Sequence, residues 1–583
     1  MTRPSLLTLI ALCAALAALG CGQSSVPVAK PMHWNPGQSL EEITADSGSV
    51  VHGRSEYLTL WHGVDPSLLR VRADSVLGDD RSSLLAATPT RISVALASSP
   101  QARRFHSAVR RLGPRPDVPT TFEAFWQPHG EEPRSLLQLT LAPLTTQLSE
   151  PWHEFAFELP QEEGELLLVC RDPRPIGARA PVTEVAWQSP VVYSPAPAAE
   201  RRPDVLLVTI DTLRSDALGH APALSSLLAK GQLWPQAVSP SNWTLPSYAS
   251  LFTGLAADQH QAGRGPFSPQ ATGAPENRQL SAVDSSLRTL ADRFREAGYA
   301  TGMIHQNPML ESWTGLNRGF ERYVRASDRS ADALELAEEF LVQNEGRPRF
   351  LVLHLMAPHL PYRVGPSPDP FDSKPLASFF GNDHTPEERA RFFALDPGQI
   401  EIVRARYYAE VSRLDSAVGP WLERQLQVSD GQLIIGFHSD HGEELWDAGS
   451  FEHGHSFDDS VVRVPVGLVA PGRIEAAVFT SSVPAEALAA NLLELAAIPH
   501  DLPFRLQDPP AKFRSQMPLY RSVLQGREFG QESSTPMPFD PQRGSGGNGA
   551  AISERKRRML AELGYLAGQE MKPPSKAAQE ERD

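Results

Sequence analysis

The chain of 583 residues is long enough for more than one domain, and its 41% hydrophobic and 21% charged residues are typical of a soluble globular protein. Its formal net charge of −15 argues against nucleic acid as a partner, because nucleic-acid binding needs a basic patch or stripe. The short basic runs at Arg201–Arg202 and Arg555–Arg558 lack interleaved aromatic residues, and we interpret both as solvated surface.

Residues 1–21 are predicted to be an export signal. Arg3 precedes the apolar run Leu6–Leu19, which has the length of a signal core but is short for a membrane span. The run ends in small residues before Cys21, which resembles the bacterial lipoprotein cleavage box, in which the cysteine is lipidated. We therefore expect an exported protein held on the cell envelope, on the periplasmic side or at the outer membrane, by a lipid on Cys21. A soluble secreted protein is the alternative.

Residues 22–36 are polar and contain proline, as expected for a tether, and residues 37–194 are predicted to form a β-rich accessory domain. Short apolar or alternating runs at Leu136–Leu141, Phe155–Leu159 and Leu166–Val169 indicate strands. The closing stretch of this predicted domain, which ends at Tyr193, resembles the last strands of a β-sandwich of carbohydrate-binding type. The residues leave open whether the domain binds glycans or is purely structural. No disulfide is expected, because Cys13 lies inside the signal and Cys21 at its edge, and Cys170 is expected to be a buried hydrophobe.

A proline/alanine linker is predicted at residues 195–202, and the pattern then changes for residues 203–500. Largely apolar runs at Val205–Ile210, Phe350–Leu355 and Leu433–Phe437 are typical of central parallel strands. Helical stretches at Ser285–Ala297 and Ser330–Gln343 lie between them. Alternating strands and helices predict an α/β domain with a mostly parallel sheet. Residues 501–583 are predicted to be a tail rich in proline and glycine, with one short helix.

Two strings of residues suggest a catalytic centre. Asp211 follows the first predicted strand of the α/β domain directly, and ligands of open α/β sheets gather beyond the carboxyl ends of strands. Thr244 opens the string Thr-Leu-Pro-Ser-Tyr-Ala-Ser-Leu-Phe-Thr-Gly254, with Pro246 suited to the first turn of a helix. Thr244 is therefore expected at a helix N-terminus, where backbone N–H groups and the helix dipole favour an anionic ester.

Both strings, with the string Phe437–Glu443, resemble motifs of the sulfatase family in the alkaline-phosphatase-like superfamily. The resemblance implies a three-layer αβα sandwich. It also implies one divalent cation (Zn, Mn or Ca) held by Asp211, Thr244, Asp440 and His441, with Thr244 as the nucleophile. Coordination would lower the pKa of the threonine hydroxyl and stabilise charge in the transition state.

Two further segments resemble substrate-facing motifs of the same family. In His354–Tyr362 the resemblance implies that His359 contacts the ester. His354 is expected to be a core residue or to lie behind the site, and it is also a possible substrate contact. In the closing motif at residues 452–465 it implies that His455 assists the leaving group. His453 is either a second substrate contact or a surface loop residue.

The chain departs from the family pattern at three positions around the nucleophile. Thr244 cannot be oxidised to the formylglycine of sulfatases, Tyr248 stands where an arginine is usual, and Thr212 replaces a second metal-binding aspartate. A threonyl sulfate would be trapped, whereas a threonyl phosphate can be attacked at phosphorus. We therefore expect phosphoester or phosphodiester chemistry, with Tyr248 among the possible substrate contacts.

A second cation is not expected, because Asp415 is followed four residues later by Gly419 and not by the histidine of two-metal relatives. His438 is the residue that could compensate.

The leading prediction is an exported, metal-dependent hydrolase of sulfate or phosphate esters that acts on a small-molecule, lipid or glycan substrate. A transferase of phosphoethanolamine or phosphoglycerol head groups at the envelope is the alternative. A third possibility is an inactive protein that binds glycans through the β-rich domain.

Overall fold

The computed structural model describes residues 41–45, 49–52, 55–59, 70–76, 79–88, 90–112, 118–144, 150–173, 183–195, 201–260, 262–263, 281–367, 395–454, 456–503 and 505–507. The chain divides into two compact units, residues 1–42 and 43–583, and all but two of the described residues belong to the second. The predicted signal with Cys21, the tether, most of the linker and nearly all of the tail lie outside the described residues. His455 lies outside them as well.

The region before the linker consists of strands. They are β1 (Glu41–Ala45), β2 (Ser49–His52), β3 (Ser55–Thr59), β4 (Arg70–Val76), β5 (Asp79–Ala87), β6 (Thr90–Leu96), β7 (Arg103–Arg111), β8 (Thr120–Pro128), β9 (Arg134–Leu141), β10 (His153–Leu159), β11 (Gly164–Arg171) and β12 (Glu184–Tyr193). The three strands that the sequence indicated here correspond to β9, β10 and β11.

Two antiparallel sheets face each other across a core in this region. One sheet has the order β6-β11-β8-β9, and the other contains β10-β7-β12-β5. Alternate residues of both sheets point into the shared core, where Phe122 of β8 meets Trp187 of β12 edge to face at a centroid distance of 5.3 Å. Cys170 is buried in the same core, as expected. The predicted β-rich, sandwich-like region is thus confirmed.

After the linker, strands and helices alternate. The strands are β13 (Asp204–Ile210), β14 (Gln232–Val238), β15 (Ala300–His305), β16 (Arg322–Arg325), β17 (Arg349–Leu355), β18 (Leu433–Ser439), β19 (Glu444–Leu445), β20 (Phe451–Glu452), β21 (Arg463–Val469) and β22 (Ala477–Val478). The helices are η1 (Ser215–His220), α2 (Pro222–Leu228), α3 (Thr244–Thr253), α4 (Ala257–His260), α5 (Leu290–Glu296), η3 (Pro308–Leu310), η4 (Ser312–Thr314), α6 (Ser330–Gln343), α8 (Pro397–Val428), α9 (Asp459–Val462), η5 (Ala485–Ala487) and α10 (Leu488–Leu495).

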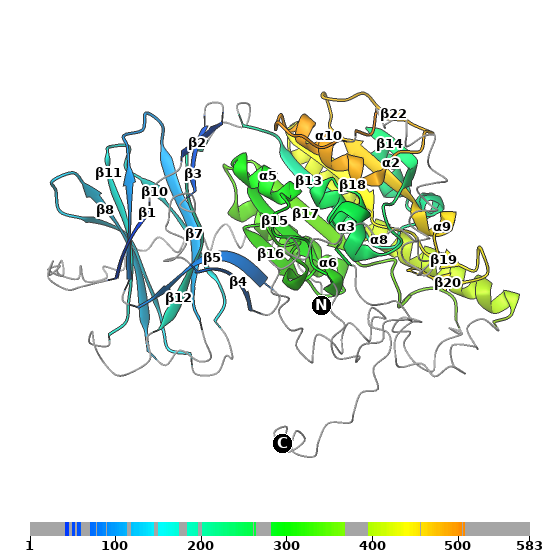
Figure 1. Ribbon diagram of the computed structural model, residues 1–583, viewed down its shortest axis with the longest axis horizontal. Coiled ribbons are helices and arrows are strands. Elements are labelled where there is room, and N and C mark those ends of the chain that lie inside the picture. The colour runs from blue at the N-terminus through cyan, green and yellow to red at the C-terminus, as the bar shows by residue number, and fades with distance from the viewer. Residues whose placement is uncertain are drawn as a thin grey trace, which may run out of the picture. The chain divides into compact units, whose positions relative to one another are not determined.

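The centre of this part is a mostly parallel sheet (Figure 1). Strands β16-β15-β17-β13-β18 run parallel to their neighbours, and β21 and β14 add antiparallel pairs beyond β18. The predicted parallel strands correspond to β13, β17 and β18. The mixed α/β fold with a mostly parallel sheet is therefore confirmed.

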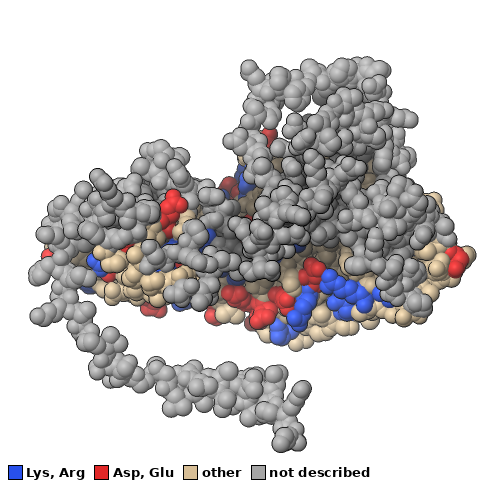
Figure 2. All heavy atoms as spheres, turned by 90° about the horizontal axis from the view of Figure 1, so that it is seen from below, with Lys and Arg blue, Asp and Glu red and all other residues tan. Residues whose placement is uncertain are grey.

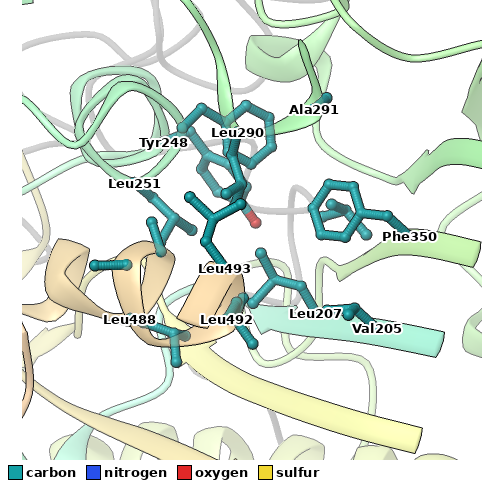
Figure 3. Close-up of a cluster of buried hydrophobic side chains, with 14 of the residues drawn as sticks. Val205, Leu207, Tyr248, Leu251, Leu290, Ala291, Phe350, Leu488, Leu492 and Leu493 are labelled. Carbon is teal, nitrogen blue, oxygen red and sulfur yellow. The ribbon is translucent and has the colours of Figure 1, made fainter. Parts of the chain in front are cut away.

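Helices cover both faces of the central strand β13, which is buried along its whole length. Val205 and Leu207 pack into a cluster with residues of α3, α5 and α10, and Figure 3 shows Tyr248, Leu290 and Leu493 converging on this face. Leu206, Val208 and Ile210 belong to the opposite cluster, with residues of α2, α6 and α8. This alternation makes three layers, αβα, and explains the continuous apolar run of the strand.

The sheet continues from the α/β part into the β-rich region. Strand β16 pairs with β15 on one side and with β5, antiparallel, on the other. Both regions therefore contribute to one sheet of 15 strands. This pairing cannot be predicted from local sequence patterns, because β5 and β16 are about 240 residues apart in the chain.

One predicted helix begins later than expected. The stretch Ser285–Ala297 was expected to be helical from its first residue, but α5 starts at Leu290. Thr289 and Asp292 form a reciprocal capping box, while the Asp284 carboxylate accepts hydrogen bonds from Ser286 in the preceding turn. The local side-chain hydrogen bonds thus set the helix start.

The described surface carries charges of both signs. Lys230 pairs with Glu423, Arg424 pairs with Glu338, and Figure 2 shows acidic and basic side chains next to each other on one face. None of the described helices is long and apolar enough to cross a membrane.

A buried ion pair supports the sandwich. The side chain of Arg111, at the end of β7, is fully buried, and its Nε and Nη2 donate to Glu150 Oε2 and Oε1 at 2.7 and 2.6 Å. The remaining donors reach the carbonyls of Val118 and Ala142 at 2.7 and 2.6 Å. Burial raises the pKa of Glu150, but hydrogen bonds from Arg111 and His153 outweigh it and lower that pKa to about 2.

We expect Arg111→Ala to lower the free energy of unfolding by about 3–5 kcal/mol, because it leaves a buried carboxylate without its partner. Urea denaturation followed by circular dichroism measures the loss. The control is Arg134→Ala, whose pair with Glu131 is exposed, and its midpoint should not move. The difference between wild type and Arg111→Ala should shrink as the pH falls from about 4.5 towards 2, because Glu150 then becomes protonated. Equal midpoints for both variants at pH 7 would contradict this account.

Candidate active site

The predicted catalytic residues lie at the carboxyl edge of the central sheet. Asp211 follows β13, Asp440 and His441 follow the neighbouring strand β18, and Thr244 is the first residue of α3. All four side chains are completely buried. Because parallel strands end at the same edge, residues more than 200 positions apart meet here.

His441 lies at the centre of this group. Its Nε2 is 3.4 Å from Thr244 Oγ1, 3.7 Å from Asp211 Oδ1 and 3.4 Å from Asp440 Oδ2. Its Nδ1 is 2.9 Å from the carbonyl oxygen of Gly442, which can only accept, so Nδ1 carries the proton. Burial lowers the pKa of His441 to about 3, and its Nε2 therefore presents a lone pair to the other three residues.

These residues fit a divalent cation. Asp211, Asp440 and His441 each offer a ligand atom, and the three atoms lie within 4.8 Å of one another. Among the described residues, Asp211 Oδ1 and Asp440 Oδ2 are buried without a hydrogen-bond partner. Burial, together with the neighbouring Asp211, raises the pKa of Asp440 well above its ordinary value. A cation between the two carboxylates would remove this repulsion, and the donor set of two carboxylates and one imidazole suits several metals.

Asp211 is held through its other oxygen. Asn307, just after β15, donates from Nδ2 to Asp211 Oδ2 at 2.6 Å and lies 3.3 Å from Thr244 Oγ1. Its Oδ1 accepts from the backbone N–H of Met309, which fixes the orientation of the amide. His354 Nε2 is also 3.2 Å from Asp211 Oδ2, while its Nδ1 accepts from the N–H of Gln306. The two donors thus leave Asp211 Oδ1 free to face His441.

Asn307 was missed by the sequence reasoning. The available signal was an asparagine two residues beyond a strand, in His305-Gln-Asn-Pro308, which is common in loops without any function. His354 is fully buried against Asp211 and so lies behind the site, which was one of the expectations for it beside a core residue and a possible substrate contact.

Tyr248, another possible substrate contact, lies one turn after Thr244 and is fully buried. Its hydroxyl donates to Thr209 Oγ1, and its ring lies 5.6 Å from that of His354. Tyr248 therefore packs between α3 and the strands β13 and β17, next to the residues that surround Asp211.

Two more histidines gather beside His441. The ring of His453 lies 4.3 Å from that of His441 and 5.1 Å from that of His359. His453 Nδ1 is 2.8 Å from Glu443 Oε1, and His359 Nδ1 is 2.7 Å from the carbonyl of Leu360. The Nδ1 contacts thus fix the orientation of both rings. His453 is mostly buried, with a side-chain exposure of 10%, and lies beside the rings of His441 and His359.

The residues considered for a second cation have other surroundings. The carboxylate of Asp415 accepts from the N–H groups of Ala223 and Leu224 at 3.0 and 2.7 Å and so caps the start of α2. His438 is fully buried in β18, and burial lowers its pKa to about 3. Within the described part of the chain, the three residues at His441 are the one group with metal-ligand geometry.

Comparison with known proteins agrees with the motifs. The sequence model of the family described as "Sulfatase" matches residues 203–498, just over half of the chain. No curated protein sequence matches significantly. Similar solved structures include a putative sulfatase from Bacteroides thetaiotaomicron (16% identity, TM-score 0.42, covering 58% of this chain and 77% of that one). A 2-O GAG sulfatase has 17% identity and a TM-score of 0.41, covering 58% and 76%. The phosphonate monoester hydrolase of Silicibacter pomeroyi has 18% identity and a TM-score of 0.40, covering 54% and 77%.

Asn307→Ala should lower kcat/KM by about 10-fold or more, because Asp211 loses a charge-assisted hydrogen bond worth roughly 1.5–3 kcal/mol and Thr244 loses a neighbouring donor. Steady-state kinetics on an activated aryl ester measures the change. Asn344→Ala is the matched control, because Asn344 is also buried but bonds to Phe340 at the end of α6. Wild-type kinetics for Asn307→Ala would remove this residue from the site.

Proposed function

The chain belongs to the sulfatase family and is thus a hydrolase of sulfate or phosphate esters, and within this class we propose that it acts on phosphate esters, in particular phosphodiesters. The proposed nucleophile is Thr244. The observation that carries the proposal is the position of the Thr244 hydroxyl, at the start of α3 and 3.4 Å from the unprotonated Nε2 of His441.

The surroundings of Thr244 suit an anionic ester. The first N–H groups of α3 have no partner within the helix, and the helix dipole adds positive potential at this end. Asp211, Asp440, His441 and Thr244 would hold the divalent cation. When bound, it lowers the pKa of the hydroxyl and neutralises charge on the ester oxygens. Asn307 keeps the hydroxyl and Asp211 in place.

The reaction then proceeds in two displacements. In the first displacement the Thr244 hydroxyl loses its proton and its oxygen bonds to phosphorus, while the bond between phosphorus and the leaving-group oxygen breaks. The leaving group gains a proton and departs as an alcohol. Water next attacks phosphorus, the bond between phosphorus and Thr244 breaks, and the hydroxyl is restored. We assign contact with the leaving group to His359 and His453, whose rings lie beside His441.

The threonine favours phosphorus over sulfur. A hydrated formylglycine has two hydroxyls on one carbon and expels sulfate by reforming its aldehyde. Thr244 has a single hydroxyl on that carbon, so release of sulfate would require water to attack sulfur. Tyr248 supports the same preference, because its buried hydroxyl bonds to Thr209 and supplies no positive charge where sulfatases have an arginine.

We expect purified protein supplied with Mn²⁺ to hydrolyse bis(4-nitrophenyl) phosphate at least 10-fold faster than 4-nitrophenyl sulfate. Thr244→Ala should lose about 100-fold or more, because no oxygen remains to attack phosphorus. Thr244→Ser should retain part of the activity, and a phosphorylated residue 244 should be detectable by mass spectrometry after acid quenching.

Thr253→Ala is the matched control, because Thr253 is a buried threonine at the other end of α3 whose hydroxyl bonds to the carbonyl of Ala249. It should remain as active as wild type. A sulfatase rate equal to the diesterase rate would overturn the preference for phosphorus. Undiminished activity of Thr244→Ala would overturn the nucleophile.

We also propose that the protein is lipidated on Cys21 and held at the cell envelope, which places the site beside lipid or glycan esters. Labelled palmitate fed to a bacterial host should enter the wild-type chain and Cys13→Ala, but not Cys21→Ala, because only Cys21 follows the small residues of the cleavage box. Unlabelled wild-type protein in the medium would favour the secreted alternative.

A further inference from the structure

The residue after Asp211 has an unusual backbone conformation. Thr212 has a φ of 54°, in the left-handed region, and is completely buried. A β-branched residue adopts this conformation only where its surroundings hold it there. Strain of this kind clusters at functional sites, so the contacts of Thr212 indicate what the conformation accomplishes.

Tyr407 of α8 holds the turn that contains Thr212. Its hydroxyl donates to the carbonyl oxygen of Thr212 at 2.7 Å and accepts from the N–H of Arg214 at 3.0 Å. The tyrosine is fully buried, with its ring edge-on to Tyr362 at 5.8 Å. One hydroxyl thus forms hydrogen bonds to two backbone groups of the turn that follows β13.

The left-handed turn directs a backbone donor at the second carboxylate. The N–H of Thr212 donates to Asp440 Oδ1 at 3.3 Å, and the N–H of His441 donates to the same oxygen at 2.9 Å. Asp440 Oδ2 has no hydrogen-bond partner among the described residues and lies 3.4 Å from His441 Nε2. Asp440 is therefore held by one oxygen, with the other facing the centre, as Asn307 and His354 arrange for Asp211.

We propose that Tyr407 is a positioning residue for the metal centre: it fixes the left-handed turn at Thr212, and that turn orients Asp440 towards the cation. The inference rests on the metal centre of the proposed function. It adds a residue from α8, on the opposite face of the sheet from α3, whose hydroxyl bonds to the backbone of the turn. Partners that orient metal ligands typically change metal affinity about 10- to 100-fold.

The test measures Mn²⁺ binding to the chelator-treated full chain by electron paramagnetic resonance of the free ion, without any ester. Tyr407→Phe should weaken Mn²⁺ binding about 10-fold or more, because the turn loses both hydrogen bonds of the tyrosine hydroxyl. Tyr408→Phe is the matched control, since its ring stacks on His220 at 4.2 Å and, in the described part of the chain, its hydroxyl makes no hydrogen bond to the turn; binding should stay within about 3-fold of wild type. An unchanged affinity of Tyr407→Phe would overturn the inference.

Thr212→Gly provides the second background, because glycine adopts a left-handed φ without help. In this background, adding Tyr407→Phe should weaken Mn²⁺ binding by less than about 3-fold. The same result supports the inference if Tyr407→Phe alone fails to fold and the double variant recovers both folding and binding. A loss of similar size in both backgrounds, or a double variant that neither folds nor binds, contradicts it.

Failure of this inference and failure of the metal centre give different results. If wild type binds Mn²⁺ and Tyr407→Phe binds it equally well, only the positioning role is wrong. If wild type binds no Mn²⁺, the metal centre itself is wrong, and the inference falls with it.

Discussion

Two buried carboxylates facing one another are the constraint on which the rest of the site depends. Asp211 and Asp440 are completely inaccessible, and burial together with the charge of Asp211 raises the pKa of Asp440 well above its ordinary value. The protein responds by holding one oxygen of each carboxylate with N–H donors and leaving the other oxygen without a hydrogen bond beside His441. The two unbonded oxygens and His441 form a group with metal-ligand geometry, and a cation bound there would offset the repulsion between the carboxylates.

The sheet makes this arrangement possible because its central parallel strands end at the same level. Thr209 of β13 is in register with His354 of β17 and His438 of β18, so the residues that follow these strands reach the same edge. Helix α3, whose residues are all buried, packs on the face of the sheet that carries Val205 and Leu207, and Thr244 at its start lies near that edge. The hydrophobic clusters on the two faces thus determine the distance between nucleophile and ligands, although none of their residues takes part in the chemistry.

The β-rich region is tied to this scaffold by backbone hydrogen bonds. Strand β5 pairs with β16, and β16 pairs with β15, the strand that leads to Asn307. The turn after β13 is fastened from the other side by α8. The β-rich region thus supports the strand that leads to Asn307, and α8 supports the turn that follows Asp211.

The sequence by itself determined the fold class, the three parallel strands and the identity of the central residues. Apolar runs such as Val205–Ile210 report burial on both faces, and the strings around Asp211, Thr244 and Asp440 name groups whose chemistry belongs together. Only the tertiary structure decided which neighbours serve them. Asn307, Thr212 and Tyr407 carry no distinctive local pattern, because their roles arise from hydrogen bonds across distant segments and from one backbone angle. For the same reason the β5–β16 pairing was invisible, since strand pairing over such a separation depends on packing and not on neighbouring residues.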